Sequence, residues 1–254
     1  MASKQRYPKI CLLVTGTRNF GSSIRARDEY GNNKHLYETY FGPIESSFNV
    51  MENQFPEMDT LHEYDVFILT GSTARISLEK KEWIDNLLDM IGLIIRLNKV
   101  LFGFCFGHQI ISKYLGAAVG IRDYPRNGLI DIPLNKLGEK LIGLPKLYIT
   151  FSHNDEVKCI KGTQLVRLSK GTNDILVLYD INKKIQIFTC QGHPELDLDM
   201  VIKLRSYMFE FYNRHTIDRY NIYNDLKDKK KLQLREVSSQ HVITLLKLVM
   251  DRKI

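Results

Sequence analysis

The sequence has few of the features that mark extracellular scaffolds, membrane proteins or metal sites. Only four cysteines occur among 254 residues, and no two of them form a Cys-x-x-Cys pair. This usage argues against a disulfide framework and against a structural zinc site. The longest apolar runs, Met90–Ile95 and Val100–Phe106, fall far short of the roughly 20 residues that span a bilayer. No signal-peptide segment precedes Ile10, so we expect a cytoplasmic protein.

The charge balance is basic but carries no nucleic-acid motif. The formal net charge is +7, from 36 Lys and Arg against 29 Asp and Glu. Such an excess raises nucleic acid as a partner. Much of it is local, however, because Asp225–Arg235 reads DLKDKKKLQLR, which is typical of a solvated linker or helix face. The sequence contains no zinc finger or RNP motif, so we expect no nucleic-acid partner.

The first half of the chain alternates between strand and helix patterns. Short apolar, β-rich runs predict buried strands at Ile10–Thr15, Asp65–Thr70 and Val100–Phe104, with a weaker candidate at Phe48–Glu52. Apolar residues at helical spacing predict helices over Glu79–Leu97 and Gly107–Leu115. This alternation predicts an α/β fold with a parallel sheet covered on both faces.

Shorter strands follow from Leu129 and predict a small antiparallel region. The predicted strands are Leu129–Pro133, Leu147–Phe151, Gln164–Leu168, Ile175–Tyr179 and Ile185–Cys190, and turn signals separate several of them. Helices are predicted at Asp197–Tyr212 and near Ser238–Met250. We place one boundary after about Asn213, so that residues 1–213 form the main domain. Residues 214–254 are then a polar linker and a C-terminal helix packed on that domain.

The segment VLFGFCFGHQII, from Val100 to Ile111, is the most informative in the chain. It reads as a buried strand, then Gly-x-Cys-x-Gly, then a helix, which is a nucleophile elbow with cysteine in place of serine. Gly103 and Gly107 allow the strand and helix to pack closely around a strained turn. Cys105 would then project at the carboxyl end of its strand, where the helix N-terminus favours a thiolate. A buried cysteine between two turn glycines is the alternative reading.

A second segment supplies the base that a nucleophilic thiol needs. Ile185–Leu196 reads IQIFTCQGHPEL, a strand followed by Gly-His-Pro-Glu. His193 therefore comes just past a strand end, as it must to meet Cys105 at the same edge of the sheet. Glu195 follows beyond a stiffening proline, so its carboxylate can reach the imidazole and fix its tautomer. An exposed His-Pro turn is the alternative, but two segments of matching chemistry favour catalysis.

These segments resemble the class I glutamine amidotransferase family. The resemblance covers approximately Lys9–Tyr212, and four ordered motifs carry it: TGS at Thr70–Ser72, GFCFGHQ at Gly103–Gln109, SHNDEV at Ser152–Val157 and QGHPE at Gln191–Glu195. The sequence is most similar to stand-alone members related to γ-glutamyl peptidases and to the glutaminase part of GMP synthase. The resemblance implies a Cys-His-Glu triad in a flavodoxin-like domain with a mostly parallel sheet and helices on both faces.

The resemblance also implies an oxyanion hole. The backbone N–H groups of Gly71 or Ser72 and of Phe106 would form it, since the donor after the nucleophile and a turn at a neighbouring strand end can face the same oxygen. The chain departs from its relatives here, with Gly-Ser-Thr at Gly71–Thr73 where many have two glycines and a proline. A second departure is GAAVG at Gly116–Gly120. Both departures bear on the substrate more than on the triad.

By the same resemblance, a pocket for the glutamyl head group lies beside the elbow. Gln109, one turn into the helix, would help to hold the substrate, and the segment Ser152, His153, Asn154 and Asp155 would line the pocket. For Ser152 and His153 a loop-capping role is the alternative, because Ser-x-x-Asp also resembles a capping signal. His108 is expected to pack or bond beside the site. Phe20–Asn33 is predicted to form a flap, and with Pro125–Gly128 it would shape the leaving-group side.

The implied reaction is cleavage of a γ-glutamyl amide through a thioester, and it needs no metal or organic cofactor. Three functions remain open. The chain is a stand-alone hydrolase of glutamine or of a γ-glutamyl peptide, a glutaminase subunit that feeds a separate synthetase partner, or a non-catalytic regulatory protein. The chain contains no phosphate-binding glycine-rich loop, so acceptor chemistry would require a partner. The intact Cys, His and Glu favour an enzyme, and we favour the hydrolase over the subunit.

Overall fold

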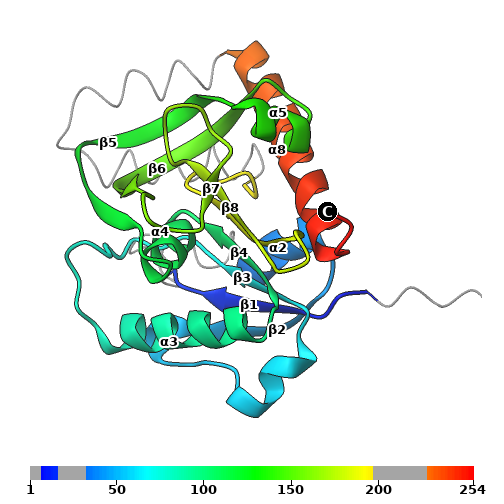
Figure 1. Cartoon of the computed structure of the whole chain (residues 1–254). Helices are drawn as coiled ribbons and strands as arrows, with labels where there is room; N and C mark the ends of the chain where they lie inside the picture. The colour runs from blue at the N-terminus through cyan, green and yellow to red at the C-terminus, as the bar shows by residue number, and fades with distance from the viewer. Residues whose placement is uncertain (1–6, 17–32, 197–227) are drawn as a thin grey trace, which may run out of the picture.

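A sheet of seven strands forms the centre of the computed structural model (Figure 1). Its order is β2-β1-β3-β4-β9-β8-β7, and the first five strands run parallel. Those five strands are β2 (Ile44–Asn49), β1 (Ile10–Val14), β3 (Val66–Leu69), β4 (Val100–Phe104) and β9 (Ile185–Cys190). Two antiparallel strands, β8 (Ile175–Tyr179) and β7 (Val166–Arg167), complete one edge. With β9 taken as the fifth strand, the parallel part has the flavodoxin-like order 2-1-3-4-5, so the predicted fold class is confirmed.

Two hydrophobic cores lie on opposite faces of this sheet, and β1 shows how the sequence builds both. Ile10, Leu12 and Val14 belong to one core, whereas Cys11 and Leu13 belong to the other. Successive side chains of a strand point to opposite faces, so a strand covered on both faces is apolar throughout. Helices α3 (Glu82–Arg96) and α4 (Phe106–Tyr114) cover the second face.

The first face is covered by two helices and by a separate two-stranded ribbon. Helices α2 (Asn33–Phe41) and α8 (Lys229–Met250) contribute buried side chains to this core. The ribbon pairs β5 (Ala118–Pro133) with β6 (Lys146–Cys159) in antiparallel register, with the short helix α5 (Lys136–Ile142) between them. Figure 1 shows the ribbon and α8 on the same side of the sheet, opposite α3. This ribbon contains two of the five strands predicted for the antiparallel region, Leu129–Pro133 and Leu147–Phe151. The other three join the central sheet, where β9 runs parallel to β4.

The strand candidate Phe48–Glu52 is only partly correct. β2 begins at Ile44 and ends at Asn49, and Val50–Glu52 form a turn of 3-10 helix that closes at Asn53 in a left-handed conformation. Strand β5 is much longer than the predicted Leu129–Pro133. Its register shifts between Ile121 and Arg126, where Pro125 lacks the N–H that a ladder needs. The turn-like sequence there is a bulge within a strand, and that is why its pattern resembles a loop.

The C-terminal helix also begins earlier than predicted. Asp228 caps α8, and its carboxylate accepts hydrogen bonds from the backbone N–H groups of Lys230 and Lys231. From Lys229 on, the basic run is therefore the first part of a helix. Arg235 departs from the expectation of a solvated face, since it is 1% exposed. The helix packs on β6, α5, α2 and β9.

The structure describes residues 7–16, 33–196 and 228–254. Three predictions fall outside them: the flap over Phe20–Asn33 apart from Asn33 itself, the helix Asp197–Tyr212 and the boundary after Asn213. Across the three ranges described, no helix is both long and apolar enough to cross a membrane.

Candidate active site

Three neighbouring strands bring the predicted site residues to one edge of the sheet. β3, β4 and β9 are adjacent and parallel, so their carboxyl ends meet at the same edge. Gly71 follows β3, Cys105 follows β4 and His193 follows β9. Open α/β sheets form their sites at this edge. The topology therefore explains how residues far apart in sequence come together.

The backbone at Cys105 forms a strained elbow between β4 and α4. Its φ is 52° and its ψ is −103°, a conformation that a residue with a side chain adopts rarely. The Cys105 N–H donates to the carbonyl of Cys190, 2.9 Å away on the neighbouring strand, which holds the turn in place. The thiol is 5% exposed and lies at the N-terminus of α4.

The two glycines that flank the elbow are required by close packing. A Cβ on Gly103 would lie 2.7 Å from the backbone of Gly107, and a Cβ on Gly107 would lie 2.6 Å from the carbonyl oxygen of Leu69. Real Cβ atoms do not approach other atoms so closely. Only glycine therefore lets α4 pack so near the ends of β3 and β4, as the motif predicts.

His193 and Glu195 form a hydrogen-bonded pair beside the thiol. His193 is fixed through its backbone N–H, which donates to the carbonyl of Thr150 on β6 at 2.8 Å. The ring atom Nδ1 lies 2.8 Å from Oε1 of Glu195. Since a carboxylate only accepts, Nδ1 carries the proton, and Nε2 is the ring nitrogen left free of Glu195. Tyr37 on α2 reaches the same Oε1 with its hydroxyl, at 3.4 Å.

The charges around His193 favour its imidazolium form. Burial on its own would lower the pKa of His193, because it disfavours a charged ring. The carboxylate of Glu195 and the thiol of Cys105 outweigh burial, and the pKa of His193 is raised well above its ordinary value. An imidazolium next to a cysteine stabilises the thiolate, so the arrangement suits a nucleophilic cysteine with an acid–base histidine.

The turn after β3 places Gly71 against both of these side chains. A Cβ on Gly71 would stand 2.9 Å from Cε1 of His193 and 3.5 Å from the Cβ of Cys105. Thr15 at the end of β1 ties this turn down, since its hydroxyl donates to the Thr70 carbonyl at 2.8 Å. Ser72 accepts a hydrogen bond from the N–H of Ala74 at 3.0 Å. Gly71 of the predicted oxyanion hole thus lies beside Cys105, and Phe106 follows Cys105 directly in the chain.

The predicted glutamyl-pocket residues lie on α4 and β6, on the thiol side. The carbonyl oxygen of Ser152 is 3.8 Å from Sγ of Cys105. Gln109 is buried, and its Nε2 donates to the Asp155 carbonyl at 2.7 Å and to Oε1 of Gln191 at 3.1 Å. Its amide hydrogens are thus engaged by the protein. Asn154, half-buried, is the single β6 residue opposite the bulge of β5.

His153 is a buried neutral histidine. Nδ1 donates to the carbonyl of Asp155 at 2.7 Å, and the ring packs on Phe151. Burial is the largest cause that lowers the pKa of His153, to about 4. Nε2 therefore has no proton, and it has no hydrogen-bond partner within the described part of the chain.

Asp155, which belongs to the predicted pocket segment, is buried and bonds to Arg75 and Ser77, two partners that sequence reasoning missed. Its Oδ1 accepts from Nε of Arg75 at 3.1 Å, and its Oδ2 accepts from the N–H of Ser77 at 2.9 Å. Burial would raise the pKa of Asp155, but the bonds from Ser77 and Arg75 hold it below its ordinary value. Asp155 thereby ties the segment after Gly71 to β6. The signal available in the sequence was Arg75, four residues after Gly71.

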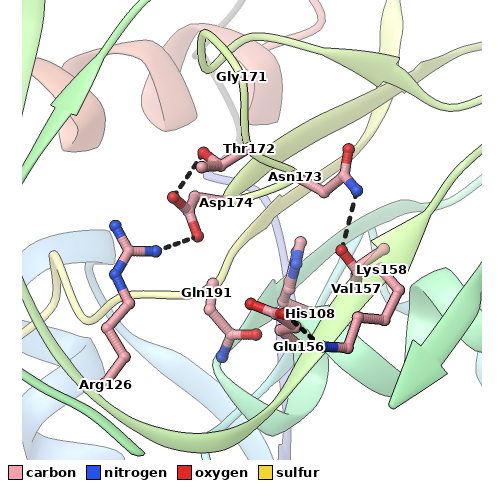
Figure 2. A pocket seen from close by; sticks show the side chains of 10 residues that line it. All are labelled: His108, Arg126, Glu156, Val157, Lys158, Gly171, Thr172, Asn173, Asp174 and Gln191. Atoms are coloured by element: carbon pink, nitrogen blue, oxygen red, sulfur yellow. Dashed lines mark hydrogen bonds and ion pairs between the residues drawn. The ribbon is translucent and has the colours of Figure 1, made fainter. Parts of the chain in front are cut away.

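A cavity of about 210 Å³ lies next to His108 of α4 (Figure 2). His108 and Gln191 line it together with Arg126, whose guanidinium pairs with Asp174 at 2.7 Å. His108 is fully buried, and its Nδ1 lies 2.9 Å from the hydroxyl of Thr189. Burial lowers the pKa of His108 to about 3. His108 therefore packs and bonds beside the site as a neutral ring, in agreement with the sequence-based expectation.

Comparison with known proteins places this geometry in a family. The family model described as "Glutamine amidotransferase class-I" matches residues 26–202. The chain belongs to the class-I glutamine amidotransferase family. The match spans the elbow, β6 and the His193–Glu195 segment, and the resemblance carried by the four motifs is thereby confirmed. Within residues 7–16, 33–196 and 228–254, no cluster of three or more His, Cys, Asp or Glu side chains is arranged to hold a metal ion.

Individual relatives of this amidotransferase family member differ in the functions for which they are named. γ-Glutamyl peptidase 4 of Arabidopsis thaliana is 28% identical over 223 residues, which cover 80% of this chain and 81% of the relative. A glutamine-hydrolyzing GMP synthase subunit of Sulfurisphaera tokodaii is 29% identical over 140 residues, 55% of this chain and 71% of the relative. A glutamine amidotransferase from Thermotoga maritima superposes with a TM-score of 0.69 at 15% identity, covering 97% of this chain and all of that one. That likeness shows the fold.

Proposed function

We propose that this chain is a cysteine-dependent amidase that hydrolyses the γ-glutamyl amide bond of glutamine or of a γ-glutamyl peptide. The observation that carries the proposal is the hydrogen bond between His193 and Glu195 at the carboxyl edge of the sheet, where the Gly71 turn lies against both His193 and Cys105. A nucleophile, a base and a group that orients the base are the parts that acyl transfer requires. The similarity to γ-glutamyl peptidases supports the choice of a γ-glutamyl substrate.

In the first half-reaction, the Cys105 thiolate attacks the amide carbon of the substrate. The developing oxyanion is held by backbone N–H groups of the Gly71–Ser72 turn and of Phe106. The C–N bond then breaks, and His193 gives its proton to the departing amine. The product on the enzyme is a thioester between Cys105 and the glutamyl group.

In the second half-reaction, water attacks the thioester carbon. His193 takes a proton from that water as a base, while Glu195 keeps the ring in the required orientation. The C–S bond breaks, glutamate leaves, and the proton on His193 restores the resting pair with Cys105. The glutamyl head group of the substrate is surrounded by residues of α4 and β6, namely Gln109, Ser152, His153 and Asn154. No step draws on a metal or an organic cofactor.

The direct test is glutamate release by the purified chain. Glutamine, glutathione and γ-glutamyl dipeptides should be compared as substrates, with Cys105→Ala as the inactive control. We expect release from at least one of them. Absence of release from every γ-glutamyl compound, with thioester formation undetectable by mass spectrometry, would refute the amidase assignment.

A second function is that of an ammonia-supplying subunit, and one observation favours it. The relative from Sulfurisphaera tokodaii is named as one subunit of a GMP synthase. A chain whose oxyanion donors are misplaced until its partner binds would be slower on its own by about 10²–10³-fold. Release of glutamate only after addition of a co-purifying synthetase would therefore favour the subunit. Turnover by the isolated chain at more than about 1 s⁻¹, within the usual range of enzymes, would favour the stand-alone hydrolase.

A further inference from the structure

We propose that Tyr37 is a positioning residue of this site, whose hydroxyl holds the Glu195 carboxylate in place against His193. The inference rests on the proposed function, since it concerns the residue that orients the base. Tyr37 lies on α2, outside every sequence motif of the site and 158 residues away from Glu195 along the chain. It extends the series Cys105–His193–Glu195 by one more side chain.

Few hydrogen-bond donors among the described residues stabilise the buried carboxylate of Glu195. The side chain is 2% exposed, so water contributes little to its solvation. Oε1 accepts from His193 Nδ1 at 2.8 Å and from the Tyr37 hydroxyl at 3.4 Å. Oε2 is buried, and no polar atom of the described residues bonds to it. Tyr37 is therefore the one donor besides His193 that the described residues offer to this carboxylate.

The ring of Tyr37 is held in a fixed position by aromatic neighbours. It stacks on Phe41, one turn later on α2, with the ring centroids 6.2 Å apart and the planes 17° apart. It also packs on Phe104, at 6.0 Å, and Phe104 is the residue directly before Cys105. The phenol is 2% exposed. Because the ring cannot shift freely, the hydroxyl is a preorganised donor whose position is set by the strand that carries the nucleophile.

The charges around the hydroxyl keep its proton in place. Burial, followed by the charge of Glu195 and its hydrogen bond, raises the pKa of Tyr37 well above its ordinary value. Tyr37 is thus a neutral phenol throughout the working pH range and always donates. Among the described residues, the other ionisable groups near this point are His193 and Cys105, together with the buried thiol of Cys190, which also experiences the charge of Glu195.

Removal of this hydroxyl should destabilise the ionised form of the Glu195 carboxyl group. A buried carboxylate that loses a donor is harder to keep charged and less firmly oriented. The imidazolium of His193, and through it the thiolate of Cys105, would lose part of its support. Because the hydrogen bond is long, the effect should be moderate. We expect kcat to fall about 3- to 10-fold with little change in KM, as the loss of one net hydrogen bond implies.

Tyr37→Phe tests this while keeping the ring and its packing. The primary measurement is the rate of Cys105 alkylation by iodoacetamide as a function of pH, which needs no substrate. We expect the midpoint of that profile to move upward by about half a pH unit in the variant. The matched control is Tyr64→Phe. Tyr64 is also buried, but its hydroxyl donates to a neutral partner, Oγ of Ser46, at 2.9 Å, away from the site.

The outcomes separate this inference from the proposed function. An upward midpoint in Tyr37→Phe with a wild-type profile in Tyr64→Phe supports the positioning role, whether or not any γ-glutamyl compound is turned over. An unchanged midpoint, or one that moves downward, overturns it even if glutamine is hydrolysed. Equal changes in both variants also overturn it, because they would reflect a general loss of packing. Thermal unfolding of both variants should show that each remains folded at the assay temperature.

Discussion

Gly71 and His193 lie so close together that a side chain at position 71 has no room. A Cβ built on Gly71 would be 2.9 Å from Cε1 of the imidazole. The backbone of Gly71 is not in the left-handed region, so its conformation alone does not require glycine. The requirement comes from the catalytic histidine of the proposed mechanism. The turn after β3 therefore sets the position of His193 as well as that of the oxyanion donors.

This relationship predicts a specific effect of Gly71→Ala. The added methyl group should push the imidazole away from the thiol, and a displacement near 1 Å can cost about 10²-fold in rate. Stability should change little, because the backbone conformation is one that alanine adopts. Glutamate release and thermal unfolding check both parts. Gly120→Ala is the control, since a Cβ there meets only the flexible side chain of Lys158 at 3.5 Å; equal losses in the two variants would count against the explanation.

The reactivity of the four cysteines should be strongly unequal. Cys105 sits at a helix N-terminus beside an imidazolium, whereas burial raises the pKa of both Cys11 and Cys190 well above the ordinary value. A glutamine-like diazo-ketone should therefore alkylate Cys105 and spare the others, as peptide mass spectrometry would show. Cys105→Ala should abolish labelling and turnover and leave the fold intact. Cys159→Ala, which removes the exposed thiol, should retain full activity; labelling at Cys159 in place of Cys105 would end the assignment.

The sequence is informative where local spacing determines the structure. The elbow at Gly103–Gly107 and the His193–Glu195 segment could be predicted because the chemistry requires these residue types at short, fixed intervals. The parallel strands could be predicted because a strand buried on both faces is apolar throughout.

Contacts between distant elements could not be predicted in this way. Tyr37 meets Glu195, and Arg75 meets Asp155, only after the sheet has brought α2 and β6 to the same edge. The bulge of β5 was hidden because Pro125 and Gly128 give a turn-like pattern inside a strand. The early start of α8 was hidden because lysines mark both linkers and exposed helix faces.

The C-terminal helix should be part of the main hydrophobic core. Leu246 is fully buried in the cluster that includes Leu12 and Phe102 of the sheet. Leu246→Ala should lower the free energy of unfolding by about 2–5 kcal/mol, as measured by urea denaturation. Leu248→Ala, on the exposed side of the same helix at 36% exposure, should cost less than about 0.5 kcal/mol. Similar small effects at both positions would indicate that residues 214–254 do not stabilise the domain.

His108 should make the stability of the protein depend on pH in a predictable direction. Burial lowers the pKa of His108 from its ordinary value of 6.5 to about 3 in the folded state. Between these two values the unfolded chain binds a proton that the folded chain does not, so stability falls as pH decreases. The contribution is complete above pH 6.5, and about 2 kcal/mol of it should be lost by pH 5.

His108→Asn should remove this part of the pH dependence. Asparagine can still place a polar atom near Thr189, and it does not titrate, so the variant should lose less stability between pH 7.5 and pH 5 than the wild type does. Urea denaturation at the two pH values measures the difference. Ile110→Val on the same helix is the matched control: Ile110 is fully buried, and the substitution should cost about 0.5–1.5 kcal/mol equally at both pH values. The direction of the pH effect also separates His108 from His193. Because the pKa of His193 is raised, its contribution to the free energy of unfolding is complete below pH 6.5 and is lost as the pH rises toward that pKa. A wild-type pH slope in His108→Asn would show that His108 is not neutral in the folded protein.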